Sequence, residues 1–226
     1  MTGELSPRLN MILSLAPEAG SYCDIGTDHG FIAIALAQRG SRVLAVDINS
    51  APLKAAEANV RRLGVKNVEL RRSDGFSAVG EGEAECAVLA GMGGDLIKRI
   101  ISSGIKGTKY LVLQPQSLIY ELRDFLAENG FVTLDEALCR EEDRFYVSML
   151  IRPGNGPISL SETEKRLGPV LLKKRPSLFV DYVNDEIRKL RLALSKIEHN
   201  GAVTANKAEY ERLIALYGGI LNDQAK

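Results

Sequence analysis

Residues 22–37 place a short apolar segment, a glycine turn and an apolar helical run in direct succession. Residues 22–25 are typical of a buried strand, Gly26 interrupts them, and residues 31–37 have the composition of a packed helix. A strand, a tight glycine turn and a helix open the doubly wound α/β folds, which bind ligands at the carboxyl ends of their strands. The sequence therefore predicts a ligand site at this turn.

A carboxylate follows the next predicted strand, residues 42–46. Asp47 lies about 20 residues beyond the turn, where such folds place an acid on ribose hydroxyls. The alternative role is to cap the turn at residues 48–51, and we favour ribose binding because the residue sits at a strand end. This spacing indicates a cofactor that contains a nucleoside.

The turn itself argues against a pyrophosphate. Gly26 and Gly30 have G-x-x-x-G spacing and lack the third glycine of the dinucleotide fingerprint. Asp24 and Asp28 bracket the turn with negative charge, which would repel a pyrophosphate and favour a cation. S-adenosylmethionine has a ribose, no phosphate, a sulfonium and an ammonium group. It is the cofactor that fits this pattern best.

Strand and helix patterns alternate along the chain as far as residue 152. Three further strands end in turns, which read Ser73-Asp74-Gly75, Gly91-Met92-Gly93-Gly94 and Gln114-Pro115-Gln116. Residues 132–138 and 145–152 then alternate as a closing antiparallel pair, the usual ending of methyltransferase sheets. We therefore predict a Rossmann-like class I methyltransferase domain with a mostly parallel, seven-stranded sheet.

The strand ends supply the candidate cofactor-binding residues. Asp74 could accept a hydrogen bond from an adenine amino group or form an Asx-turn, and its spacing leaves both open. The glycines at residues 91–94 permit close backbone approach to the methyl acceptor, or simply form a tight turn. The predicted cofactor-binding set is Asp24, Gly26, Thr27, Asp28, Asp47, Ile48, Asp74, Gly75, Ala90, Gly91 and Met92.

Composition restricts the remaining possibilities. The chain has 29 Lys and Arg and 29 Asp and Glu, so its net charge is zero and a nucleic-acid-binding surface would have to be local. Cys23, Cys86 and Cys139 are widely separated within apolar runs, which favours buried thiols over a metal site. With no secretory signal and no run long enough to span a membrane, we expect a soluble, cytoplasmic protein.

Two prolines and two glycines within residues 153–157 predict a domain boundary there. We expect a methyltransferase domain at residues 1–156 and a helical domain at residues 157–226. Apolar residues recur at heptad spacing in two runs, which are Val180, Val183, Ile187, Leu190, Leu194 and Ile197, then Tyr210, Leu213, Tyr217 and Ile220. They predict an antiparallel coiled-coil hairpin, broken at Asn200-Gly201. Heptads alone favour a stabilising or dimerising element over a substrate-binding arm, and we expect a monomer or a weak dimer.

The helical part has a local positive charge. Residues 165–191 contain eight cations and three anions, which gives +5. A charged run is usually a solvated face, but this excess beside a cofactor domain is also suited to phosphates.

Three motifs then identify a family. Asp24-Ile25-Gly26-Thr27-Asp28-His29, Ala90-Gly91-Met92-Gly93-Gly94 and Leu113-Gln114-Pro115, in this order, resemble the bacterial tRNA (adenine-N1)-methyltransferases that act on adenine 22. The opening Ser6-Pro7-Arg8-Leu9 and residues 141–146 are similar too, so the resemblance covers nearly the whole chain. It implies a Rossmann-like S-adenosylmethionine domain and a C-terminal coiled coil that helps to hold tRNA. Two positions depart from the family pattern: Gln116 stands where asparagine is common, and Gly30 where we expect alanine.

The resemblance implies methylation of N1 of adenine 22 in tRNA, with S-adenosylmethionine as cofactor. N1 is already an unprotonated nucleophile, so alignment rather than a strong base would drive the reaction. We expect the target base, flipped from its pair, to meet the candidate catalytic residues Asp28, His29, Gly91, Met92, Gln114 and Gln116. The candidate RNA-binding residues are Arg8, Lys173, Lys174, Arg175, Arg188, Lys189 and Arg191.

Other functions stay open on the sequence alone. A methyltransferase of this fold could act on another RNA or on a small molecule, because a fold does not choose its substrate. A non-catalytic cofactor- or RNA-binding protein is more distant, since both the cofactor turn and the acceptor-side glycines are kept. A nicotinamide dehydrogenase is disfavoured by the missing third glycine, and a hydrolase by the absence of G-x-S-x-G.

Overall fold

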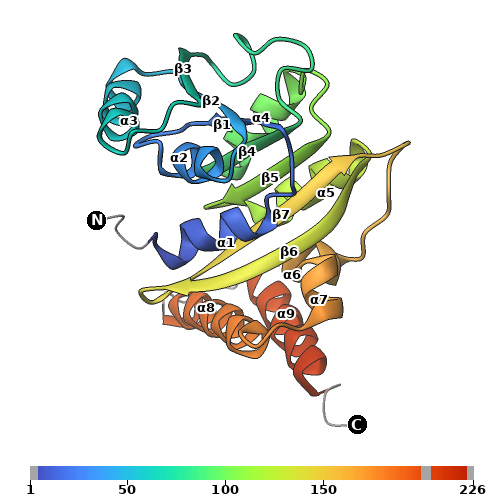
Figure 1. Cartoon of the computed structure of the whole chain (residues 1–226). Coiled ribbons are helices and arrows are strands. Elements are labelled where there is room, and N and C mark those ends of the chain that lie inside the picture. The colour runs from blue at the N-terminus through green and yellow to red at the C-terminus, as the bar shows by residue number, and fades with distance from the viewer. Residues whose placement is uncertain (1–4, 200–204, 223–226) are drawn as a thin grey trace. The chain divides into compact units, whose positions relative to one another are not determined.

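The computed structural model describes residues 5–199 and 205–222 (Figure 1). The chain divides into two compact units, Met1–Lys174 and Arg175–Lys226. None of the helices within the described ranges combines the length and the apolar character that a membrane span requires.

The first unit is built on one seven-stranded sheet with the order β3-β2-β1-β4-β5-β7-β6. The first five strands run parallel, and β7 pairs antiparallel with both β5 and β6. This sheet confirms the predicted Rossmann-like α/β fold. The strands are β1 (Ser21–Ile25), β2 (Arg42–Asp47), β3 (Val68–Arg72), β4 (Cys86–Met92), β5 (Tyr110–Pro115), β6 (Phe131–Glu141) and β7 (Arg144–Pro153).

Helices cover both faces of the sheet, which explains why the central strands are continuously apolar. All five residues of β1 are buried, and Cys23 pairs in register with Leu44 of β2 and Ala87 of β4. The helices of this unit are α1 (Pro7–Leu15), α2 (Phe31–Gln38), α3 (Ser50–Arg62), α4 (Gly94–Ser102), α5 (Ile119–Glu128), α6 (Glu162–Leu167) and α7 (Pro169–Lys174).

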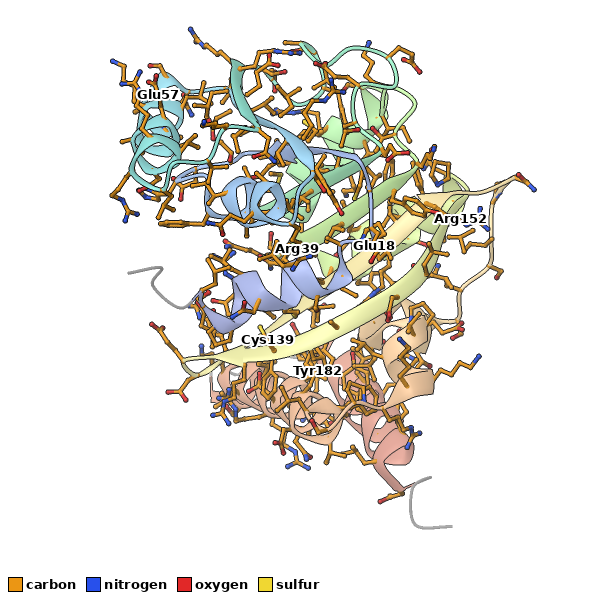
Figure 2. The ribbon with its side chains drawn as sticks, viewed as in Figure 1. Glu18, Arg39, Glu57, Cys139, Arg152 and Tyr182 are labelled. Atoms are coloured by element: carbon orange, nitrogen blue, oxygen red, sulfur yellow. The ribbon has the colours of Figure 1, made fainter. Side chains whose placement is uncertain are left out.

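Two apolar layers hold the helices on the sheet. On one face, Ile97 of α4 and Leu122 of α5 pack with Phe76. On the other, α1 and α2 contribute Ile12 and Leu36. The three cysteines are free and buried, as the sequence predicted, and Figure 2 labels Cys139 on β6. The sheet is therefore a rigid support for the loops at its strand ends.

Gly30 explains one of the two departures from the family pattern. It begins α2 in the left-handed region, with φ 74°, and a Cβ atom there would lie 3.0 Å from Cβ of Ala56 on α3. Glycine suits this position in this chain, because alanine would be both strained and crowded.

A buried ion pair fastens α6 and α7 to the sheet. Arg123 on α5 donates from Nε to Oε1 of Glu136 on β6 at 3.0 Å. Its Nη1 donates to the carbonyl oxygens of Lys165 and Arg166 near the end of α6. Glu136 Oε2 accepts from the amide nitrogens of Val170 and Leu171, at 2.9 and 3.2 Å, at the start of α7. Every bond involves charge, and such bonds are the stronger class.

These contacts bear on the predicted domain boundary. The sequence suggested a division after residue 156, but α6 and α7 pack on α5 and β6, and the compact units separate between Lys174 and Arg175. A proline- and glycine-rich segment marks a loop, and here the chain returns to the same unit after the loop.

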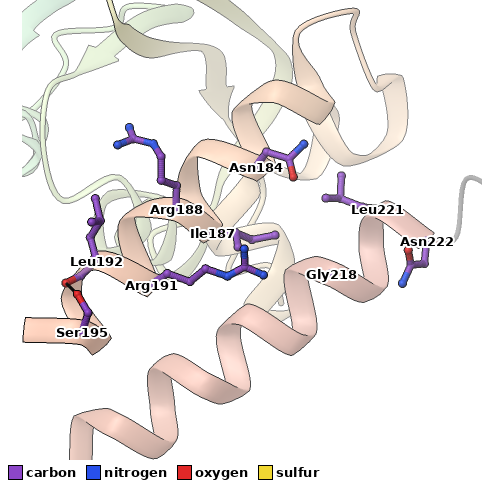
Figure 3. A pocket seen from close by; sticks show the side chains of 9 residues that line it. All are labelled: Asn184, Ile187, Arg188, Arg191, Leu192, Ser195, Gly218, Leu221 and Asn222. Carbon is purple, nitrogen blue, oxygen red and sulfur yellow. Dashed lines mark hydrogen bonds between the residues drawn. The ribbon is translucent and has the colours of Figure 1, made fainter. Parts of the chain in front are cut away.

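The second unit contains α8 (Phe179–His199) and α9 (Ala205–Asn222), which contact each other and run in opposite directions (Figure 3). Of the predicted apolar seam, Val183, Leu213 and Tyr217 are among the buried residues, whereas Val180 is 37% exposed. The predicted break at Asn200-Gly201 lies outside the described residues.

Candidate functional site

The turn after β1 is fixed by backbone hydrogen bonds to the neighbouring strand. The amide nitrogens of Gly26 and Thr27 both donate to the carbonyl oxygen of Val46, at 2.9 and 3.0 Å. Gly26 has φ 74° and Asp28 has φ 50°, so the chain reverses sharply before α2. This geometry exposes the backbone of Gly26 at the carboxyl end of β1 and buries the side chain of Thr27.

Asp24 lies beneath the turn. Its carboxylate is buried and accepts a hydrogen bond from Thr27 Oγ1 at 2.7 Å. Burial raises the pKa of Asp24 to about 6, and the bond from Thr27 partly opposes that rise. Neither residue lines the cavity described next, so their predicted contact with a cofactor stays a prediction, while their role in shaping the turn is direct.

A cavity of about 260 Å³ opens beside the carboxyl ends of the central strands. The residues around it come from β1, β2 and β4, from the turn that follows β3 and from α4. Eight of the eleven predicted cofactor-binding residues line it, namely Gly26, Asp47, Ile48, Asp74, Gly75, Ala90, Gly91 and Met92. The fold therefore brings together turns that are far apart in the sequence.

Two carboxylates face this cavity. Asp47 is half-buried, and its Oδ1 accepts the amide of Asn49 at 2.9 Å, so the turn-capping role coexists with a position on the cavity wall. Asp74 is exposed, and in the described part of the chain its carboxylate accepts no hydrogen bond. The Asx-turn alternative is therefore not realised at Asp74, and both of its carboxylate oxygens are available to a ligand.

Glycines keep the cavity open at two points. A Cβ atom at Gly26 would lie 3.0 Å from Cε of Met92, and one at Gly75 would lie 3.0 Å from Cγ2 of Ile100. Both glycines also have positive φ. At each position a side chain would crowd a residue that lines the cavity.

Several cavity residues were not predicted. Ile25, Ser73, Leu96, Arg99 and Ile100 also line it. The last three belong to α4, whose apolar spacing indicates an ordinary packed helix, so the sequence holds no signal for this contact. Arg99 adds a positive charge to a wall that otherwise bears two carboxylates.

Gln114 lies at the end of β5 and is fully buried. Its Oε1 accepts from the amide of Gly91 at 3.2 Å and from Nη1 of Arg8 at 3.0 Å, while its Nε2 donates to the carbonyl of Pro115. Because both ends of the amide are engaged within the protein, the geometry supports orientation of the Gly91 loop rather than contact with a base.

The other residues that we predicted to meet the target base are more accessible to solvent. Gln116 is exposed. Its backbone N–H donates to the backbone carbonyl of Met92 at 2.9 Å, which joins the turns after β4 and β5. The side chains of Asp28 and His29 are 73% and 56% exposed and approach within 3.8 Å of each other. The His29 ring also stacks on Phe31. Neither lines the cavity, and both lie on the surface of the turn.

Arg8 lies beside Gln114 at the end of β5 and close to Gly91 in β4. Besides its bond to Gln114, its amide nitrogen donates to Glu141 Oε2 at 2.8 Å and its guanidinium lies 5.8 Å from the centre of the Tyr146 ring. Nη1 would be 3.6 Å from a Cβ atom at Gly91. The sequence singled out Arg8 as an RNA contact but gave no indication that it touches the glycine loop.

The remaining candidate RNA-binding residues are divided between the units, with Lys173 and Lys174 in the first. Lys174 Nζ lies 2.7 Å from Asp135. Arg175 in the second unit lies over the Phe179 ring, at 5.8 Å from its centre. Arg188 and Lys189 both pair with Asp185, which reduces the local excess of positive charge. Arg191 is exposed and lines a groove between α8 and α9. In the described ranges, no three His, Cys, Asp or Glu residues are grouped so that they could hold a metal ion.

Comparison with known proteins gives consistent matches. Residues 22–218 match the family model described as TrmK, tRNA (adenine(22)-N(1))-methyltransferase. The Bacillus subtilis enzyme of that description is 27% identical over 221 residues, which cover 93% of this chain and 92% of that protein. Its crystal structure superposes with a TM-score of 0.81 at 25% identity, covering 96% and 98% of the two chains. A Streptococcus pneumoniae protein solved in complex with S-adenosyl-L-methionine gives 0.83 at 28% identity, covering 96% and 100%.

Proposed function

The chain belongs to the TrmK family of tRNA (adenine(22)-N(1))-methyltransferases, and we propose that it methylates N1 of adenine 22 in tRNA, with S-adenosylmethionine as cofactor. The observation that carries this function is the cavity at the carboxyl ends of the parallel strands, where the family's glycine and carboxylate motifs converge. The family model matches residues 22–218, so the proposed function rests on both compact units.

The cavity suits the cofactor chemically. In this proposal Asp47, on the cavity wall, accepts from ribose hydroxyls, and the unbonded carboxylate of Asp74 accepts from the adenine amino group. Gly26 and Gly91 present backbone rather than side chains to the ligand. When bound, S-adenosylmethionine supplies the methyl group that is transferred.

We propose that the target adenine binds between the turn at Asp28 and His29 and the loop that begins at Gly91. Adenine N1 carries a lone pair at neutral pH, so the protein has to align it rather than deprotonate it, a contribution worth up to ~7–11 kcal/mol in well-aligned cases. Alkylation of N1 makes the base cationic, and the exposed carboxylate of Asp28 would stabilise that charge as it develops. Gln114 holds the loop in place, and Gln116 contacts the base.

The base lies within a folded RNA, so it has to leave its pair to reach the site. We propose that Arg8 binds a phosphate next to the flipped nucleotide, supported by its position beside Gly91 and Gln114. The helical part would hold the body of the tRNA through Lys173, Lys174, Arg175, Arg188, Lys189 and Arg191. We also propose that α8 and α9 form an antiparallel coiled coil, that the enzyme is a monomer or weak dimer, and that it acts in the cytoplasm, where its substrate is made.

The test is methyl incorporation from labelled S-adenosylmethionine into unmodified tRNA transcripts that carry adenine or guanine at position 22. We expect incorporation with adenine and none with guanine. Equal incorporation into both transcripts would show that another nucleotide is the target. Cofactor binding without incorporation into any tRNA would refute the proposed function.

A further inference from the structure

A groove of about 530 Å³ lies between α8 and α9 within the second unit (Figure 3). It is about twice as large as the cofactor cavity and falls in the size range, roughly 300–1,000 Å³, of pockets that hold small ligands. Every described residue that lines it belongs to one of these two helices.

The charge of the groove is positive. Arg188 and Arg191 line it, and no acidic residue does among the residues that the structure describes. Arg188 shares Asp185 with Lys189, whereas Arg191 has no carboxylate partner within the described part of the chain. In Figure 3 the Arg191 side chain extends from α8 towards α9, across the groove. An unpaired guanidinium in this position is suited to a phosphate group.

The rest of the lining combines apolar surface with neutral polar groups. Ile187 is buried and Leu192 is 50% exposed. Leu221 lines the groove from α9, and Asn184 and Asn222 add amides. Apolar surface suits the face of a nucleobase, and amides suit the hydrogen-bonding groups on its edge.

Gly218 keeps the groove open on the α9 side. A Cβ atom at this position would meet no other atom within 4 Å. Glycine inside a helix costs about 1 kcal/mol relative to alanine. Gly219 is the next residue of the same helix, it also has open space around its Cβ position, and it does not line the groove.

We propose that this groove binds one unpaired nucleotide of the tRNA, with its phosphate on Arg191 and its base against the apolar side chains that line the groove. The inference rests on the proposed function, because it takes tRNA as the partner. Paired RNA presents its phosphates on the outside and hides the faces of its bases, whereas a loop nucleotide can present both. The groove would therefore select a loop of the folded tRNA and add to the grip on its backbone.

Filling the groove tests the proposal. We would compare the dissociation constants for unmodified tRNA, and the KM and kcat of methylation, in wild type, Gly218→Leu and the control Gly219→Leu. Leucine favours a helix more than glycine does, so both variants should fold, which circular dichroism would verify. We expect Gly218→Leu to weaken tRNA binding at least tenfold through KM, and Gly219→Leu to match wild type. Cofactor affinity should be the same in all three.

Two further measurements identify the ligand. Arg191→Gln should reduce the slope of log affinity against log salt by about 0.7, the value for one phosphate contact on a single strand. A benzophenone side chain in place of Leu192 should crosslink to a loop nucleotide after irradiation.

Equal tRNA affinity in Gly218→Leu and Gly219→Leu would overturn the proposal, as would crosslinks confined to base-paired nucleotides. A wild-type protein that binds cofactor but methylates no tRNA would instead refute the proposed function. The two failures are thus distinguishable.

Discussion

The hydroxyl of Thr27 donates a hydrogen bond to the carboxylate of Asp24 at 2.7 Å, beneath the turn that follows β1. Burial nevertheless raises the pKa of Asp24 to about 6, because a charged carboxylate is costly where water cannot reach it. Protonation of this group is therefore linked to folding.

The sign of this linkage gives a first prediction. In the unfolded chain Asp24 titrates near its ordinary pKa, roughly 3.9, so between pH 4 and 6 the folded state holds a proton that the unfolded state has lost. This contribution, on the order of 3 kcal/mol, is present below about pH 4 and is lost as pH rises to about 6. Urea unfolding of wild type and Asp24→Asn across this range would measure it. The difference between them should grow in favour of the variant with rising pH, and a constant difference would contradict the shifted pKa.

Asp47 is predicted to serve both the turn and the cofactor. Asp47→Asn keeps an oxygen that can accept from the Asn49 amide but removes the charge, so stability should hold while cofactor affinity falls about tenfold to 100-fold. Isothermal titration calorimetry would report the affinity, and thermal unfolding the stability. If the asparagine variant bound cofactor like wild type, the carboxylate would serve the turn alone.

Gly30 is predicted to be required for close packing. Gly30→Ala should cost about 1–2 kcal/mol for the left-handed backbone and a further ~1–3 kcal/mol for crowding against Ala56. Gly64→Ala is the matched control, since its φ of 67° is similar and its surroundings are open. Adding Ala56→Gly should recover part of the crowding loss in Gly30→Ala, because it removes the contact at 3.0 Å but leaves the Cα of residue 56 at 3.3 Å, and glycine inside α3 itself costs about 1 kcal/mol. Equal losses at positions 30 and 64 in chemical denaturation would argue against the packing explanation.

Arg8 is predicted to act on RNA and not on cofactor. Arg8→Ala should lower kcat/KM for tRNA about tenfold to 100-fold, because the glycine loop loses a neighbour and the nucleotide loses a charged contact. Arg61→Ala, which removes an exposed arginine from α3, serves as the control. Steady-state methylation with calorimetry of cofactor binding would separate the effects. A matching loss of cofactor affinity in Arg8→Ala would place its role elsewhere.

The Arg123–Glu136 pair is predicted to be worth far more than a surface ion pair. Glu136→Gln keeps the shape but leaves the Arg123 charge buried without a partner charge, at a cost of about 3–5 kcal/mol. Glu57→Gln breaks the exposed pair with Arg61 and should cost less than ~0.5 kcal/mol. Urea unfolding of both variants would compare them directly, and similar small losses would show that the buried pair is dispensable.

The fold and the outline of the site follow from sequence because each depends on local patterns. Asp47 and Gly91 were identifiable, since parallel strands bring their carboxyl ends to one edge wherever the chain alternates strand and helix. The Gln114 side chain was harder to interpret. Its bonds to Arg8 and Gly91 span 106 and 23 positions, and nothing in the local sequence distinguishes a buried amide from one that faces a ligand.

Charged residues were the least predictable. Arg123 and Glu136 read as ordinary surface residues of a helix and a strand, yet both are buried, because they satisfy each other and the open ends of α6 and α7. Likewise, the excess of cations at residues 165–191 did not reveal that Arg188 and Lys189 share Asp185. Which charges face water is decided by tertiary contacts rather than by composition.

The buried pair of Arg123 and Glu136 also limits how the chain can be divided by recombination. A crossover at residue 156 would separate Glu136 from the backbone amides and Arg123 from the carbonyl oxygens that complete their bonding. A catalytic part inherited without α6 and α7 would carry two ionic groups with half their partners missing. Chimeras between relatives should therefore function when joined after Lys174, and exchange of α8 and α9 in evolution is expected to respect the same limit.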